Sequence, residues 1–262
     1  EVEYYKKLFQ TIGNIIKLIE KDDMPKYLLF LENAFPYMDN YNYHKGMNGI
    51  IQELKCLLKT KNIGTDSDQA LLLDFQAALE TKPEKAIKLE KDALAQIENI
   101  TADNARLVSH LPANLGGLNL MNGHPDLARE HMEKSISLLD QFNLLHINDS
   151  IPQIANYAMF LTEQQEPERG ISELQKLSGI IKEYHSDDCL DYAKVQETLG
   201  TIYLMTANLP QAKTHFKRAF KIYEKIWADE PEMIEAKYQE IQELYPQIGF
   251  CIGKNLSGLL TK

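Results

Sequence analysis

A pattern that recurs at a fixed spacing constrains the fold of this chain more than any other feature. Its three clearest copies are "NLGGLNLMNGHPDLA", "NYAMFLTEQQEPERG" and "TLGTIYLMTANLPQA", which begin at Asn114, Asn156 and Thr198. Successive copies therefore start 42 residues apart, and they align without a gap. Self-similarity at such a period indicates a repeat array, in which each unit buries its apolar face against its neighbours.

Each copy has the pattern of two helices joined by a short turn. Apolar residues recur with a helical period, stop at "NGHP", "QQEP" or "ANLP", and then resume. A proline stands at or near the start of every second helix, where its missing N–H costs little. The "HPD" of 124–126 falls in one of these turns. We interpret it as a turn sequence and not an active site, because the other two copies carry different residues at the same place. A weaker fourth copy lies 42 residues earlier, breaks at "TKP" and carries Asp74 in place of a small residue.

Small residues occupy two fixed positions of the repeat. The first position holds Gly116, Ala158 and Gly200, and the second holds Ala128, Gly170 and Ala212. A glycine inside a helix costs roughly 1 kcal/mol relative to alanine, so a close approach of two helices is the expected reason for it. We predict that Gly116 faces the Ala128 side of its own hairpin. Gly117 has no such counterpart, since its siblings are Met159 and Thr201.

The copy that begins at Thr198 has small and large apolar residues in a recognisable order. They are Leu199, Gly200, Tyr203, Ala212, Phe216 and Ala219. This series resembles the signature of tetratricopeptide repeats. The 42-residue period is similar to the longer repeats of kinesin light chains and of many bacterial signalling proteins. The resemblance implies an all-α fold, a right-handed α-solenoid of antiparallel helix pairs.

The same resemblance divides the chain into three parts. Residues 1–66 are expected to form N-terminal helices from degenerate repeats. Residues 67–230 hold the tetratricopeptide repeats, which start near 67, 109, 151 and 193. Residues 231–262 are expected to form capping helices, the last of them in "FCIGKNLSGLLTK". Because Glu1 is not a methionine and stands inside an amphipathic pattern, we expect the chain to be a fragment, or a processed form, of something longer.

The composition argues against several classes of function. With 28 basic and 38 acidic residues the net charge is −10, which disfavours direct binding of nucleic acid or of an anionic membrane. No apolar run approaches the roughly 18–20 residues of a membrane span. Cys56, Cys189 and Cys251 include no CxxC pair and are expected to be reduced thiols of a cytoplasmic protein.

No motif of catalysis stands out. The chain has no nucleophile elbow, P-loop, dinucleotide fingerprint or kinase signature, so we expect no catalytic residue, no cofactor and no enzyme activity. The "HSDDC" of 185–189 gathers candidate ligands in one loop, but its tight spacing matches no standard metal site. We expect no metal there, and we expect Asp187 or Asp188 to cap the following helix.

The resemblance also implies a binding site, because the first helices of such repeats line a groove that holds a peptide. The residue before each Leu-small or Tyr-small pair then points into the groove, and an asparagine there can donate to and accept from a peptide bond. Residues one turn away share that face. The predicted peptide-binding residues are Asn114, Asn156, Thr198, His110, Lys194 and Gly117. Several are similar to the carboxylate clamp of heat-shock co-chaperones, from which His110 and Thr198 depart.

Two functions follow from the repeat pattern and the resemblance. The first is a non-catalytic scaffold whose groove binds an extended peptide or a segment of a partner protein. The alternative is the peptide-sensing regulatory domain of a larger bacterial transcriptional or signalling regulator. Both require a protein or peptide partner, and formation of a homodimer is left open.

Overall fold

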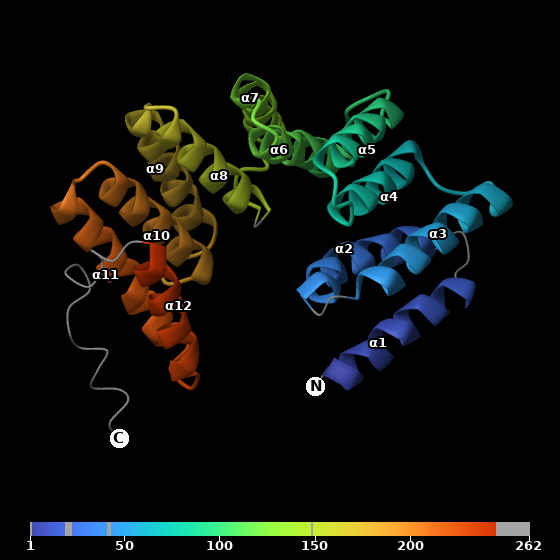
Figure 1. Cartoon of the computed structure of the whole chain (residues 1–262), viewed down its shortest axis with the longest axis horizontal. Coiled ribbons are helices and arrows are strands. Elements are labelled where there is room, and N and C mark those ends of the chain that lie inside the picture. The colour runs from blue at the N-terminus through green and yellow to red at the C-terminus, as the bar shows by residue number, and fades with distance from the viewer. Residues whose placement is uncertain (1, 19–22, 41–42, 148, 245–262) are drawn as a thin grey trace. The chain divides into compact units, whose positions relative to one another are not determined.

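Helices account for all the regular structure in the described part of the chain. A computed structural model describes residues 2–18, 23–40, 43–147 and 149–244. Within these ranges there are twelve α-helices, one 3-10 turn and no strand (Figure 1). The predicted all-α architecture is therefore confirmed. No helix in the same ranges is long and apolar enough to cross a membrane.

Four helix pairs form the repeats. They are α4 (Asp66–Ala78) with α5 (Pro83–Gln96), α6 (Ala105–Met121) with α7 (Pro125–Gln141), α8 (Ser150–Glu163) with α9 (Pro167–Tyr184), and α10 (Leu190–Met205) with α11 (Leu209–Ile226). The second helices begin at residues 83, 125, 167 and 209, so the predicted period of 42 residues is confirmed. The chain also forms α1 (Val2–Ile15), a 3-10 turn (Ile16–Leu18), α2 (Met24–Asn40), α3 (His44–Lys61) and α12 (Pro231–Leu244).

The chain divides into two compact units, Glu1–Leu138 and Leu139–Lys262. In the first unit, helices α1 to α4 share an apolar core that includes Phe9, Leu54 and Leu72. The rings of Phe35 and Phe75 stack at 4.6 Å between centroids and tie α2 to α4. Aromatic stacking of this kind adds to the stabilisation that burial alone provides.

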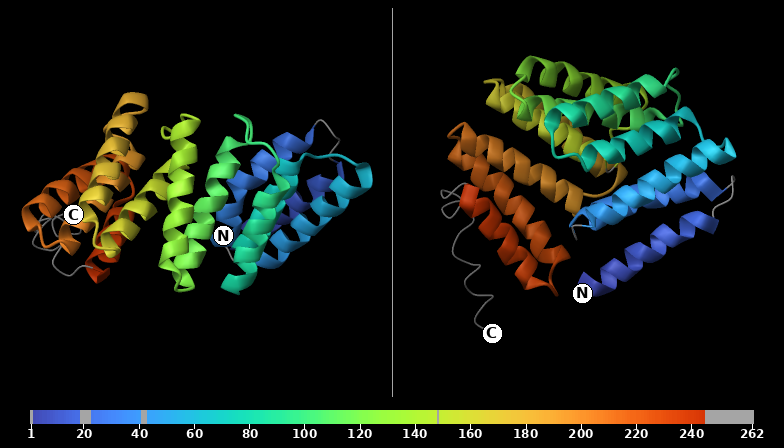
Figure 2. Two further views of the ribbon diagram at one scale, coloured as in Figure 1. Left: turned by 90° about the horizontal axis from the view of Figure 1, so that it is seen from above. Right: turned by 45° about the vertical axis from the view of Figure 1, so that its right-hand side comes forward.

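The second unit consists of α8 to α12, with α10 packed on α8, α9 and α11 (Figure 2). Its largest buried side chains include Phe160, Phe216 and Tyr223. A polar contact joins α12 to this core, because Lys237 Nζ lies 3.0 Å from Glu197, which also accepts a 2.6 Å hydrogen bond from the Tyr223 hydroxyl. The final helix predicted after α12, and Cys251 within it, lie outside the described residues.

The turns inside three of the hairpins share one hydrogen-bond pattern. The N–H groups of His124, Glu166 and Asn208 donate to the carbonyls of Asn119, Leu161 and Tyr203, at 2.7–2.8 Å. Just before them, Gly123, Gln165 and Ala207 have φ angles of 77°, 67° and 57°. A left-handed residue followed by such a bond is a Schellman-type helix end. His124 therefore belongs to a turn, as predicted for the "HPD" sequence.

The small residues lie where the two helices of a hairpin approach most closely. A Cβ on Gly116 would lie 2.5 Å from Cγ of Met132 and 3.3 Å from the carbonyl oxygen of Ala128, so the predicted facing of Gly116 and Ala128 is confirmed. A Cβ on Gly170 would lie 2.5 Å from the carbonyl oxygen of Ala158. At Gly116 and Gly170 the missing Cβ therefore lets the two helices pack more closely than a larger residue would.

Candidate functional site

The predicted binding residues lie on the first helices of three repeats. His110, Asn114 and Gly117 belong to α6 in the first unit. Asn156 belongs to α8, and Lys194 and Thr198 belong to α10, in the second unit. The residues that directly follow the three predicted contact positions are buried, namely Leu115, Tyr157 and Leu199. The first helices thus keep an apolar packing face next to a more polar face.

In the second unit, α8 and α10 bring three predicted residues onto neighbouring helices. Asn156 and Lys194 are exposed, and Thr198 is half-buried. The Thr198 hydroxyl donates a 3.0 Å hydrogen bond to the carbonyl oxygen of Lys194, one turn earlier in α10. Lys194 Nζ lies 3.9 Å from the half-buried Asp191, and because the lysine is exposed to solvent the pair contributes little to stability. Asn156 and Lys194 are therefore the members of this set that solvent reaches.

Asn114 has a different environment, because its side chain joins two carboxyl groups of the preceding repeat. Its Nδ2 donates to Oδ1 of Asp74 at 2.8 Å and to Oε1 of Glu90 at 3.1 Å. Both hydrogens of the amide are thereby used, which leaves the carbonyl oxygen to accept a bond from another group. Asn114 also links α6 to α4 and α5, so it holds two repeats together.

The acidic pair that Asn114 contacts replaces an apolar pair of the other repeats. Asp74 stands at the position of Gly116, and Glu90 stands at the position of Met132. Both acids are buried, with 7% and 2% of their surfaces exposed. Their proximity could have been inferred from the alignment of repeats, which places Glu90 where Met132, Leu174 and Phe216 stand.

Burial and charge together keep a proton on Glu90. Burial, and then the neighbouring Asp74 carboxylate, raise the pKa of Glu90 far above its ordinary value, while the hydrogen bond from Asn114 opposes the rise. Oε2 of Glu90 is buried and accepts no hydrogen bond from the described residues. A neutral Glu90 can donate its proton to Asp74, which is the way two adjacent buried carboxyls avoid repulsion.

A second buried polar cluster lies in the second unit and was not anticipated from the sequence. Gln196 of α10 is 1% exposed, and its Oε1 contacts Nδ1 of His215 at 2.9 Å and NH1 of Arg218 at 3.2 Å. Its Nε2 donates to the Ser178 hydroxyl at 3.2 Å. Burial, and then Arg218, lower the pKa of His215. The cluster joins α9, α10 and α11 across the boundary between two repeats.

In the loop that contains "HSDDC", the helix cap differs from the one predicted. The residue that caps α10 is Cys189, whose Sγ accepts from the backbone N–H of Tyr192 at 3.4 Å. Asp188 instead pairs with Lys225 of α11. The prediction that Asp187 or Asp188 caps this helix was therefore wrong, because an ion pair to the neighbouring helix takes one of the carboxylates. His185 Nε2 lies 2.8 Å from the carbonyl oxygen of His146.

Gly117 differs from its neighbour Gly116 in having open space around it. A Cβ at Gly117 would meet no heavy atom within 4 Å. We expect Gly117→Ala to raise the free energy of unfolding by about 0.5–1 kcal/mol, the usual gain when alanine replaces an unconstrained helical glycine. Urea denaturation followed by circular dichroism measures this change. An unchanged or lower stability would show that the position is constrained by something other than packing.

The geometry defines an array of antiparallel helix hairpins with small-residue contacts inside each hairpin, which is the architecture of tetratricopeptide-type repeat proteins. The family model of the tetratricopeptide repeat matches residues 150–225, which comprise α8 to α11 almost completely. A comparison with curated proteins found no match.

Several solved structures share the fold at low sequence identity. BtubC (BKLC) from P. vanneervenii is 19% identical, with a TM-score of 0.57 over 70% of this chain and 72% of that one. The kinesin light chain-like TPR repeats of Podosopora anserina are 12% identical, with a TM-score of 0.55 over 75% and 96%. A Rap protein complexed with Competence and Sporulation Factor is 14% identical, with a TM-score of 0.50 over 96% and 77%. The likeness to all three is one of fold.

Proposed function

We propose that this chain is a non-catalytic scaffold that binds an extended peptide or a segment of a partner protein along the first helices of its repeats. The observation that carries the proposal is the tetratricopeptide repeat array of residues 150–225, a fold used chiefly for protein–protein interaction. In this array Asn156 is exposed on α8, which packs against α10, the helix that carries Thr198 and Lys194. Amide and hydroxyl groups can bind a peptide backbone without selecting its side chains.

His110, Asn114 and Gly117 have a corresponding proposed role in the first unit. Asn114 has only its carbonyl oxygen left for a ligand, so we propose that it accepts from a peptide N–H and does not also donate. The open space at Gly117 would admit a ligand close to the helix backbone.

The alternative proposal, a sensing domain of a larger regulator, draws on one comparison. The Rap protein whose structure contains Competence and Sporulation Factor aligns with 96% of this chain. A helical array of this kind can change shape when a ligand bridges its repeats, and thereby regulate whatever is attached to it. We rank this second because the likeness is one of fold, and fold alone does not specify function.

A peptide array incubated with purified protein tests the scaffold proposal. We expect the double variant Asn156→Ala/Thr198→Ala to bind the peptides retained by the wild-type chain roughly 10-fold more weakly or worse, since each lost hydrogen bond costs about 1 kcal/mol. Gln175→Ala is the matched control, because Gln175 is exposed on the second helix α9. Equal retention by the wild-type chain and the double variant would remove these residues from the site.

A further inference from the structure

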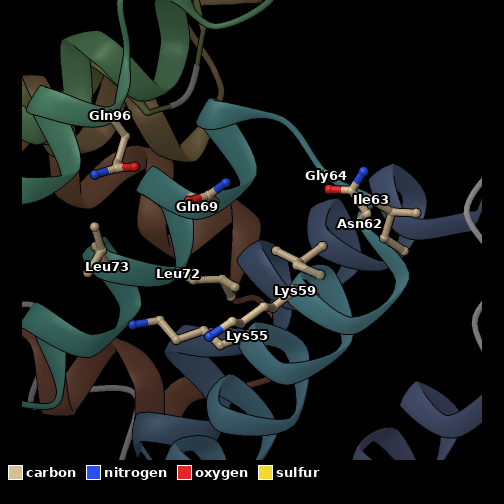
Figure 3. A pocket seen from close by; sticks show the side chains of 10 residues that line it. Lys55, Lys59, Asn62, Ile63, Gly64, Gln69, Leu72, Leu73 and Gln96 are labelled. Carbon is tan, nitrogen blue, oxygen red and sulfur yellow. The ribbon is translucent and has the colours of Figure 1, made fainter.

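A cavity of the first unit lies between α3 and α4 and is separate from the residues of the proposed groove. It has a volume of about 500 Å³, within the range of small-molecule sites (Figure 3). The chain opens this space where it turns from α3 into α4, at Asn62 and Gly64, whose φ angles are 49° and 97°. The capping box between Thr65 and Asp68 then fixes the start of α4.

One part of the cavity wall is apolar. Leu58 of α3 and Leu72 of α4 are almost fully buried beneath it, and Ile63 and Leu73 complete this surface. Ile63 and Leu73 are half-buried, so contact with a compact apolar group of a ligand would remove their remaining apolar surface from water.

The polar part of the wall consists of lysine ammonium groups and glutamine side-chain amides. Lys55 and Lys59 lie one turn apart on α3, and Gln69 and Gln96 contribute side-chain amides (Figure 3). None of the residues described as lining the cavity carries a carboxyl group, although the chain as a whole has a net charge of −10. The cavity is thus a local site for an anion on an acidic protein.

Lys55 in particular lacks a carboxylate in its immediate contact. Its Nζ donates to Oε1 of Gln76, a neutral partner, and leaves further N–H donors for a ligand. Partial burial lowers the pKa of Lys55, as expected for an ammonium group that is desolvated and not compensated by an anion. An anionic ligand would supply that compensation.

We propose that this cavity binds an apolar carboxylate, with the carboxylate at Lys55 and Lys59 and a compact apolar body against Ile63 and Leu73. Two sources share this chemistry, a free small acid and the C-terminal residue of a peptide. For the peptide end, the amides of Gln69 and Gln96 can pair with the preceding peptide bond. The cavity shares no residue with those proposed for the groove, since its lining comes from α3, the segment between α3 and α4, α4 and the end of α5.

The test is titration of the full chain, followed by NMR through the side-chain amide signals of Gln69 and Gln96. The probes are 4-methylpentanoate and N-acetyl-Gly-Leu, each compared with its neutral carboxamide. For ligands of this size we expect a Kd on the order of 1 mM for the acids, with at least about 10-fold weaker binding of the amides. Binding of the small acid alone identifies a free metabolite-like ligand, and binding of N-acetyl-Gly-Leu alone identifies a chain end; either supports the proposal.

The variant Lys55→Gln/Lys59→Gln is expected to lose the preference for acid over amide. Lys85→Gln/Lys88→Gln is the matched control, since these exposed lysines of α5 change the net charge equally. Circular dichroism checks that both variants are folded. The proposal is overturned if acids and amides shift the two signals equally, if neither acid shifts them at about 10 mM, or if the control pair loses the preference as well.

Discussion

Gly170→Ala is expected to lower the free energy of unfolding by about 1–2 kcal/mol. A Cβ at this position would lie 2.5 Å from the carbonyl oxygen of Ala158, in the helix against which α9 packs. That oxygen belongs to the backbone of α8 and cannot rotate away, so the two helices would have to separate. Overpacking of this kind costs about 1–3 kcal/mol or more, and the helix propensity of alanine offsets only about 1 kcal/mol.

Gly179→Ala is the matched control, because Gly179 lies in the same helix and a Cβ there would meet nothing within 4 Å. This variant should be more stable than the wild-type chain by about 0.5–1 kcal/mol. The two glycines thus predict changes of opposite sign within one helix, measured as urea midpoints by circular dichroism. If both variants moved in the same direction, close packing would not be the reason for Gly170.

Glu90→Gln is expected to stabilise the protein at neutral and alkaline pH. In the unfolded chain Glu90 releases its proton near the ordinary pKa of 4.5, whereas burial and Asp74 raise its pKa in the folded chain. Between these two pKa values the folded state binds more protons than the unfolded state, so the stability falls as the pH rises above about 4.5. Glutamine has nearly the shape of the neutral carboxyl and carries no proton to lose.

The difference in stability between Glu90→Gln and the wild-type chain should therefore be small near pH 4 and grow to the order of 1–3 kcal/mol by pH 8. Denaturation midpoints measured at a series of pH values give this difference directly. Glu98→Gln, a change at an exposed residue just after α5, is expected to leave the pH profile unchanged. A constant difference across the pH range would mean that Glu90 is ionised in the folded protein.

The repeat architecture could be predicted from the sequence because a single period fixes the pattern of each hairpin. The roles of Gly116 and Ala128 follow from the same register, since small residues at matched positions have one common explanation, the close approach of two helices. The turn at His124 was also predictable, because the equivalent positions of the other repeats carry different residues and so share only the place of a turn.

The polar contacts between repeats could not be predicted in the same way. A helical period tells which face of a helix is buried, but not which buried polar residues meet across helices from different repeats. The period therefore predicts Asn114 only as a groove residue, although it donates to Asp74 and Glu90. Gln196 and Ser178 were missed for the same reason, since they belong to neighbouring repeats and are in contact only in the fold.

The spacing of the helices has a consequence for how the length of the chain can change. The turns inside the last three hairpins have equal length and the same backbone hydrogen bonds, so an added residue there would rotate the second helix away from its partner. The segments that lead from one hairpin to the next vary, spanning residues 97–104, 142–149 and 185–189. Insertions, epitope tags and fluorescent labels therefore belong in these connecting segments, where natural length variation has already been accommodated.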